Sequence, residues 1–213
     1  MKTVERFKAL QLRREGQSLK EISNKLNVSK STVSLWVRDV VLSKDAEKLL
    51  LSKIKLGQYV GAEKKKAQTR AKEENYYNEA VKELRRGASE DKIVCAMIFW
   101  CEGTKNVKNG VTFTNSDPKL VKKFLSLLRK TFQLDERKFR PCIHLHGYHS
   151  PQKQLDFWSK ITDIDKRQFI KPYLKPNTGK RLHENYEGCI SIKYHDNDLA
   201  RRLTAFSKAY LDS

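Results

Sequence analysis

Hydrophobic positions near the start of the chain recur at the three- and four-residue spacing of amphipathic helices. The first run predicts a helix over residues 3–14, with the apolar positions Val4, Phe7, Leu10 and Leu12. Ser18 and Glu21 have the spacing of a capping box, which begins a second helix with the apolar positions Leu19, Ile22 and Leu26. Ser29 or Ser31 can cap a third helix that ends near Val40 and buries Val33, Trp36, Val37 and Val40.

Three short helices with a tight turn before the third are typical of a DNA-binding helix-turn-helix. The segment SLKEISNKLNVSKSTVSLWV resembles this motif: small Ser23 lies where the helices cross, and Asn27 suits a left-handed turn residue. The third helix would present five side chains to phosphates and bases: Lys30, Ser31, Thr32, Ser34 and Arg38. A helical hairpin that binds protein is the alternative.

Residues 43–88 contain no proline and are rich in charged helix formers. Ser43 predicts the start of a short helix, and a long exposed helix is expected from Ala62 onward. A stripe in the second half of this region can dock on the next domain: Tyr76, Tyr77, Ala80, Val81 and Leu84. The region is either a solvated spacer or a basic arm that follows DNA through Lys64–Arg70.

The remainder of the chain mixes helical and alternating patterns. Helices are expected over 90–101, 119–132, from Ser150-Pro151 onward and over 197–211, and strands over 111–114, 138–146, 168–175 and 189–194. Asn109-Gly110 predicts a hairpin turn before the first strand. The sequence thus predicts an α+β fold in three parts. These are a helix-turn-helix domain over 1–42, a helical connector over 43–88 and a domain over 89–213 whose helices cover a mostly antiparallel sheet.

The charge balance points to a polyanionic partner. The 213 residues include 44 Lys and Arg against 25 Asp and Glu, a net charge of +19. Double-stranded DNA is the first partner to expect and an anionic membrane surface the second. No apolar run approaches the roughly 20 residues of a membrane span, and the first residues lack a signal-peptide pattern. A cytoplasmic, nucleoid-associated protein with reduced cysteines is expected.

One stretch of the sequence contains a candidate catalytic acid. Residues 95–103, CAMIFWCEG, form an apolar helix with small residues near its start that ends on an acid and a glycine. Together with the following turn and VTFTNSDPKLVKKFLSLL, this resembles the LAGLIDADG motif and second helix of homing endonucleases. The resemblance covers about residues 89–213 and excludes the helix-turn-helix. A simpler interpretation is that Glu102 is an exposed acid and Gly103 an ordinary left-handed helix cap.

The resemblance implies a site-specific DNA endonuclease that uses a divalent metal. Glu102 corresponds to the metal-binding acid, and it is the candidate catalytic residue together with Lys193; Mg²⁺ is the expected cofactor. Because the chain has one acid-glycine helix, a homodimer would bring two copies of Glu102 together, through Cys95, Ala96 and Phe99. The sheet and its loops would contact DNA through Lys105, Lys108, Thr112, Thr114, Lys138, Arg140, Lys171, Lys175, Lys180 and Arg181.

Other functions remain open from the sequence. A transcription regulator with an inactive LAGLIDADG-like domain, used for dimerisation and DNA reading, is the main alternative; an RNA-binding or mobile-element accessory protein is a further one. His144 and His146 share a strand face with Cys142 and could bind zinc with His149. His183, Asn185 and His195 suggest an HNH nuclease, although the usual residue order is missing.

Overall fold

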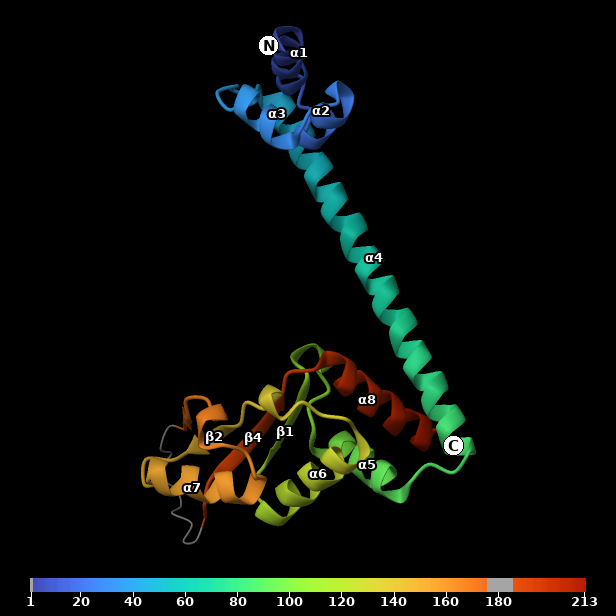
Figure 1. Cartoon of the computed structure of the whole chain (residues 1–213), viewed down its shortest axis with the longest axis vertical. Helices are drawn as coiled ribbons and strands as arrows, with labels where there is room; N and C mark the ends of the chain where they lie inside the picture. Colours follow the sequence, from blue (N-terminus) through green and yellow to red (C-terminus); the bar gives the residue numbers. More distant parts are fainter. Residues whose placement is uncertain (1, 176–185) are drawn as a thin grey trace. The chain divides into compact units, whose positions relative to one another are not determined.

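The computed structural model describes residues 2–175 and 186–213, and the chain divides into two compact units, Met1–Thr69 and Arg70–Ser213. Figure 1 traces both units along the sequence. The division falls inside one long helix, α4 (Lys44–Arg85), so each unit is described by itself. The domain boundaries after residues 42 and 88 remain a prediction. Within the described residues, none of the helices is both long enough and apolar enough to cross a bilayer.

The first unit contains the three expected helices, α1 (Thr3–Arg14), α2 (Leu19–Leu26) and α3 (Lys30–Val37), followed by the first part of α4. Its core consists of Ala9, Ile22, Val33 and Val37, with half-buried apolar side chains packed around them. The extent of α1 was predicted well, but its two first apolar positions do not reach this core. Val4 is 66% exposed and Phe7 is 70% exposed, because the face of α1 that meets α3 is centred on small Ala9.

Local hydrogen bonds fix the turns of the first unit. Ser18 and Glu21 form the predicted capping box: the Ser18 amide donates to the Glu21 carboxylate at 2.7 Å, and the Glu21 amide donates to the Ser18 hydroxyl at 3.2 Å. Asn27 is left-handed with φ 50°, as its place in the turn predicts. The Ser23 hydroxyl donates to the Val28 carbonyl at 2.7 Å. Ser29, rather than Ser31, caps α3.

The connector is one helix rather than two. α4 continues for 42 residues through Gly57 and Gly61, where the sequence predicts the end of a short helix. The Ser43 hydroxyl caps its start by accepting from the Ala46 amide at 3.2 Å. Each interior glycine costs about 1 kcal/mol relative to alanine. The strong helix formers on both sides offset this cost, so the helix does not break.

The second unit is an α+β domain built on a four-stranded mixed sheet (Figure 1). Its helices are α5 (Glu90–Glu102), α6 (Pro118–Thr131), α7 (Pro151–Thr162) and α8 (Asn197–Leu211). Its strands are β1 (Val111–Asn115), β2 (Cys142–Leu145), β3 (Tyr173–Leu174) and β4 (Cys189–Tyr194), in the spatial order β1-β4-β2-β3. β4 is antiparallel to both β1 and β2, and β3 is parallel to β2, so two of the three ladders are antiparallel, as predicted.

One face of this sheet is the base of the core. Val111 and Phe113 on β1 and Ile190 and Ile192 on β4 lie there, together with buried side chains from α5, α6, α7 and α8. The final turns of α4 dock on the same core. Ala80 is buried, and Tyr77, Val81 and Leu84 pack around it, which confirms the predicted docking stripe.

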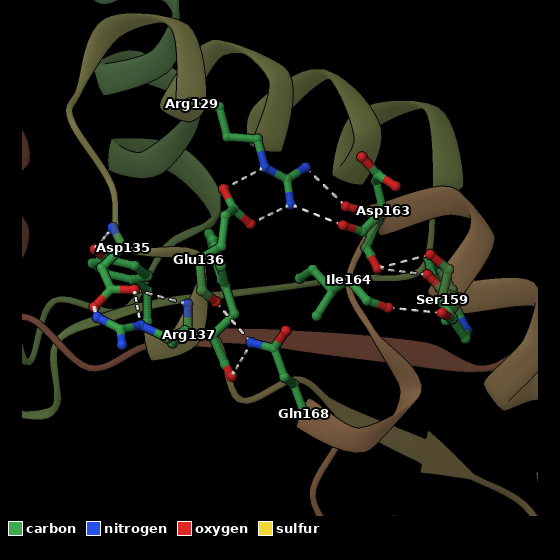
Figure 2. A network of polar contacts seen from close by, with 12 residues as sticks. Arg129, Asp135, Glu136, Arg137, Ser159, Asp163, Ile164 and Gln168 are labelled. Carbon is green, nitrogen blue, oxygen red and sulfur yellow. Dashed lines mark hydrogen bonds and ion pairs between the residues drawn. The ribbon is translucent and has the colours of Figure 1, made fainter.

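Arg129 of α6 joins three segments around the edge of this core (Figure 2). Its guanidinium donates to both carboxylate oxygens of Glu136, at 3.0 and 2.9 Å. It also donates to the Thr162 and Asp163 carbonyls at the end of α7, at 2.8 and 3.3 Å. Gln168 then donates to the Glu136 carbonyl at 2.7 Å. These bonds fix the segment that leads into β2.

Three sequence expectations for the second unit were wrong in detail. The Asn-Gly hairpin is replaced by a 3₁₀ turn over Val107–Asn109, followed by Gly110 with φ 76°. β1 pairs along its whole length with distant β4 and meets the preceding segment only at the bridge between Gly103 and Phe113. The strand expected over 138–146 is only Cys142–Leu145, since a 3₁₀ turn over Glu136–Lys138 comes first. The strand expected over 168–175 has two residues, because another 3₁₀ turn, Lys166–Gln168, uses its start.

Candidate nucleic-acid interface

The recognition helix α3 presents a polar surface formed by its first turns. Lys30, Ser31, Ser34 and Arg38 are exposed and Thr32 is half-buried. The Ser29 hydroxyl accepts from the Thr32 amide at 3.1 Å and is hydrogen-bonded to the hydroxyls of Ser31 and Thr32, at 2.8 and 2.7 Å. The cap therefore holds two of the predicted hydroxyls in place. Lys30 and Arg38 are the cations at the two ends of this surface.

The second face of the sheet in the other unit stays outside the hydrophobic core. Strand alternation places one set of side chains there, which we call the open face. Tyr173 is exposed, Cys142 and Ser191 are only 5% and 3% exposed, and the other side chains are half-buried. The open face consists of Thr112, Thr114, Cys142, His144, Tyr173, Cys189, Ser191 and Lys193. Thr112 is paired with Lys193, and the Thr114 hydroxyl donates to the Ser191 hydroxyl at 2.9 Å. None of the four described strands contains a carboxylate.

Cations border this face. The Arg140 amide donates to the Lys193 carbonyl at 2.8 Å, so Arg140 lies beside the end of β4. Its guanidinium donates to the Arg137 and Phe139 carbonyls, at 2.7 and 2.6 Å. The pKa of His144 is lowered by burial and further by Lys175 and Lys193, so its imidazole is neutral at pH 7 and these lysines provide the charge. Lys171 is exposed beside the same edge. The open face therefore combines hydroxyl and imidazole groups with a cationic border.

A polar hollow of about 890 Å³ continues from Thr112 and Lys193 to the start of α8. Its other lining residues are Lys72, Thr104, Lys108, Asn109, His195, Asp196, Asn197, Asp198 and Arg201. Asp198 lies 3.7 Å from Lys72 and accepts from Arg201 at 3.2 Å. Arg201 also lies 3.7 Å from Glu73, so two carboxylates balance these two cations. Lys108 and Lys193 have no carboxylate partner within the described part of the chain. They give the hollow its positive charge.

Two predicted DNA-contacting lysines are engaged within the protein. Lys138 binds the Asp196 carboxylate at 3.0 Å, and this hydrogen bond raises the pKa of Lys138. Lys105 donates to the Trp100 carbonyl, with its ammonium 4.0 Å from the centre of the Trp100 ring. Lys105 thus supplies the positive charge that the C-terminus of α5 favours. Lys180 and Arg181 lie outside the described residues, as do His183 and Asn185.

Glu102 is exposed at the last position of α5. The side-chain amide of Asn115, at the end of β1, donates to its carboxylate at 3.2 Å. Lys193 is paired with Thr112, which lies three residues, or about 10 Å, before Asn115 along β1. Across residues 2–175 and 186–213, no three His, Cys, Asp or Glu side chains are grouped as a metal site. One copy of Glu102 with Asn115 thus offers a single carboxylate to a hard cation.

Gly103 is required by packing rather than by a left-handed cap. Its φ is −82° and its ψ is 162°, an extended conformation open to any residue. A Cβ at this position would come within 2.5 Å of the Phe99 ring and the Phe99 carbonyl oxygen. The Gly103 amide donates to that carbonyl at 2.8 Å, and Gly103 is bridged to Phe113 of β1. The cap interpretation was therefore wrong, and close contact explains the glycine.

The dimer residues predicted from the resemblance are buried within their own domain. Cys95, Ala96 and Phe99 are at most 3% exposed because this face of α5 packs on α6 and α8. The Ser207 hydroxyl of α8 donates to the Ala96 carbonyl at 2.8 Å, and burial raises the pKa of Cys95 to about 12. These side chains cannot meet a second copy. The outer side of α5 carries Val94, Met97 and Cys101 at helical spacing, with Val94 43% exposed.

Within the histidine cluster, His149 is held by hydrogen bonds to both of its ring nitrogens. His149 accepts from the His146 amide through Nδ1 at 2.9 Å, and its Nε2 lies 2.8 Å from the Tyr186 carbonyl oxygen. Since Nδ1 is the acceptor, Nε2 carries the proton and donates. Both ring nitrogens of His149 are occupied, and the described residues contain no three-ligand group, so the zinc hypothesis is not supported. His195 lines the polar hollow instead.

Comparison with known proteins identifies the first unit only. A family model described as a homeodomain-like domain matches residues 1–47. No curated protein and no solved structure matches the chain. Residues 1–47 are thus similar to homeodomain-like domains, and this supports the helix-turn-helix, a motif that places its last helix in the DNA major groove. The LAGLIDADG resemblance of the second unit stays a prediction.

Proposed function

We propose that the protein is a sequence-specific DNA-binding protein that contacts DNA through both units. The recognition helix α3 reads the major groove, and the open face provides a second contact surface. The observation that supports the second contact is the charge distribution: the strands contain no carboxylate, while Lys193, Lys175 and Arg140 border their uncovered side. Phosphate contacts of this kind supply much of the affinity for DNA.

We further propose that the second unit is a divalent-metal-dependent endonuclease domain, with Glu102 as its metal-binding acid. Glu102 is exposed at the end of α5, and its carboxylate accepts from Asn115, which strand alternation places on the core side of the edge strand β1. DNA on the open face would reach Glu102 around the end of that strand. Two copies of Glu102 and the scissile phosphates would hold Mg²⁺, which activates the attacking water. Lys193 stays beside Thr112 on the open face and would stabilise charge on the phosphate.

This chemistry needs a homodimer, because each chain provides one such acid. The outer stripe of α5 consists of exposed Val94 and Cys101 and half-buried Met97, and it leads to Glu102. Contact between two of these stripes would bring both Glu102 carboxylates to one axis. Met97→Lys should then convert the dimer to a monomer in sedimentation equilibrium, whereas a dimer that persists in this variant would contradict the α5 contact.

The decisive experiment measures cleavage. The full-length protein is incubated with a randomised duplex library and Mg²⁺, beside the variants Glu102→Gln and Glu90→Gln. Glu90 is an exposed acid at the opposite end of α5 and is the matched control. Cuts that need Mg²⁺, survive in Glu90→Gln and disappear in Glu102→Gln would support the endonuclease. Specific binding without cutting by the wild-type protein would exclude it.

A transcription regulator whose second unit reads DNA without cutting it is the second candidate. It is favoured by the bond from Asn115 to Glu102 and by the packing of Gly103 on Phe99, since both explain the acid-glycine pair without catalysis. If the protein is such a regulator, selection from the duplex library should yield a defined binding site. The Glu102→Gln variant should then bind that site as tightly as the wild type. The two candidates therefore differ in one readout, strand cleavage.

A further inference from the structure

Leu35 is an exposed apolar residue on the recognition helix α3. It is 66% exposed, whereas Val33 and Val37 are buried in the core of the first unit, at 0% and 4% exposure. Leu35 is two residues away from each valine, which is a rotation of about 200° around the helix axis. Leu35 therefore points away from the core and into solvent.

The side chains around Leu35 are polar and belong to the surface proposed to contact DNA. Ser31 lies one turn before Leu35 and Arg38 one turn after it, so both are its neighbours along the helix. Both are exposed, and so is Ser34. The Ser31 hydroxyl is held by the Ser29 hydroxyl at 2.8 Å. Among the residues of α3, only Leu35 is large, apolar and exposed.

Three observations indicate that DNA, rather than a protein, covers Leu35. The first unit is similar to homeodomain-like domains, α3 contains no carboxylate, and Lys30 and Arg38 stand at its two ends. Single exposed leucines are common on protein surfaces, so exposure alone would assign no role. At this position, a helix that enters the major groove brings Leu35 against the edges of the bases.

A leucine side chain matches only one of the four bases in the major groove. Thymine presents its C5-methyl group there, whereas adenine and guanine present N7 acceptors and cytosine presents an amino donor. Leucine has no side-chain donor or acceptor, so against those three bases it would displace water without replacing the lost hydrogen bonds. Contact with the thymine methyl group removes apolar surface from water on both molecules.

We propose that Leu35 contacts the C5-methyl group of a thymine and so fixes thymine at one position of the binding site. The proposal rests on the DNA-binding function proposed for α3 and assigns a base to it. Along the helix axis, Leu35 is about 6 Å from Ser31 and about 4.5 Å from Arg38. Base pairs are stacked about 3.4 Å apart. The thymine therefore lies between the groups that Ser31 and Arg38 contact.

The test removes the methyl group from the DNA and the leucine from the protein, separately and together. The full-length protein selects a binding site from a duplex library, without Mg²⁺ so that no DNA is cut. Each thymine of this site is then replaced in turn by deoxyuridine, which lacks only the methyl group. Fluorescence anisotropy gives the dissociation constants. At one thymine, the replacement should raise the Kd of the wild type about fourfold, the effect of one buried methyl group.

Leu35→Ala should abolish this effect, because the variant binds the thymine and deoxyuridine duplexes equally and both more weakly than the wild type binds thymine. Leu35→Met keeps an apolar side chain of similar volume and should retain the effect. Alanine and methionine are strong helix formers, so both variants should stay folded, which circular dichroism checks. Val41→Ala is the matched control and should also retain the effect, because Val41 is 90% exposed and lies outside α3.

The outcomes separate failure of this contact from failure of the proposed function. A wild-type protein that selects no binding site would refute specific DNA binding and the Leu35 contact together. A selected site at which no deoxyuridine weakens binding would overturn the contact alone, and so would a Leu35→Ala variant that keeps every methyl effect of the wild type. Wild-type affinity of Leu35→Ala for all these duplexes would also overturn it and would leave Leu35 for a protein partner.

Discussion

At the scale of single residues, the acid-glycine pair at the end of α5 has two separate explanations. Gly103 is required by the contact with Phe99, and no catalytic role is needed for it. Glu102 remains exposed, with only the Asn115 amide as a hydrogen-bond donor among the described residues. The pair of Glu102 and Gly103 therefore supports nuclease activity less than the sequence pattern alone indicates. The argument rests on Glu102 alone.

Gly103→Ala should destabilise the second unit by about 1–3 kcal/mol, because the added Cβ overlaps the Phe99 ring and carbonyl. Urea unfolding of the full-length protein measures this loss. Gly147→Ala is the matched control, since a Cβ there would meet nothing within 4 Å. Equal stability of the two variants would refute the packing explanation of Gly103.

Glu21 makes the first unit sensitive to acid. The Ser18 backbone amide, followed by Lys53, lowers the pKa of Glu21 to about 2. Because the pKa in the folded state lies below that of the unfolded chain, the stabilisation is complete above about pH 4.5 and is lost as the pH falls toward 2. The protection factors of the amides in α2, which correct for the intrinsic pH dependence of hydrogen exchange, should fall over this window. Glu21→Gln should remove most of that change, whereas Glu5→Gln on α1 should leave it.

At the scale of elements, local patterns located the helices better than the strands. The capping box of Ser18 and the turn at Asn27 were predictable because both depend on residues close in sequence. α8 has the predicted bounds for the same reason. β3 and the start of β2 were not predictable, because strand length depends on which distant segment provides the pairing.

The recognition helix α3 should account for a measurable part of the salt dependence of DNA binding. Lys30→Ala and Arg38→Ala should each reduce the slope of log affinity against log salt by about 1 if the residue contacts one phosphate. Fluorescence anisotropy at several salt concentrations gives the slope. Lys8→Ala, on the exposed side of α1, is the control. A slope unchanged in both α3 variants would contradict their assigned role.

At the scale of the whole molecule, the distribution of charge matters more than its total. The net charge of +19 predicts a polyanionic partner but does not identify the surface that binds it. Folding neutralises some cations, such as Lys138 with Asp196, and leaves others, such as Lys193, without a carboxylate partner among the described residues. The DNA contacts that we propose for the second unit therefore lie at the border of the open face.

Lys193→Ala should weaken DNA binding and reduce its salt slope by about 1, because it removes a cation from the open face. Lys122→Ala removes an exposed lysine from α6 and should have a smaller effect. The measurement is anisotropy on the site selected from the duplex library. If Lys122→Ala matched Lys193→Ala, the second unit would bind DNA through general charge rather than through this face.

The sequence by itself determined the helix-turn-helix, its caps and the cationic character of the protein, because these depend on neighbouring residues and on composition. Tertiary structure decided the rest. Only the packing of α5 on α6 and α8 showed that Cys95, Ala96 and Phe99 are internal. Only the pairing of β1 with β4 brought Thr112 beside Lys193. Burial and strand register depend on segments far apart in the chain, and no local pattern records them.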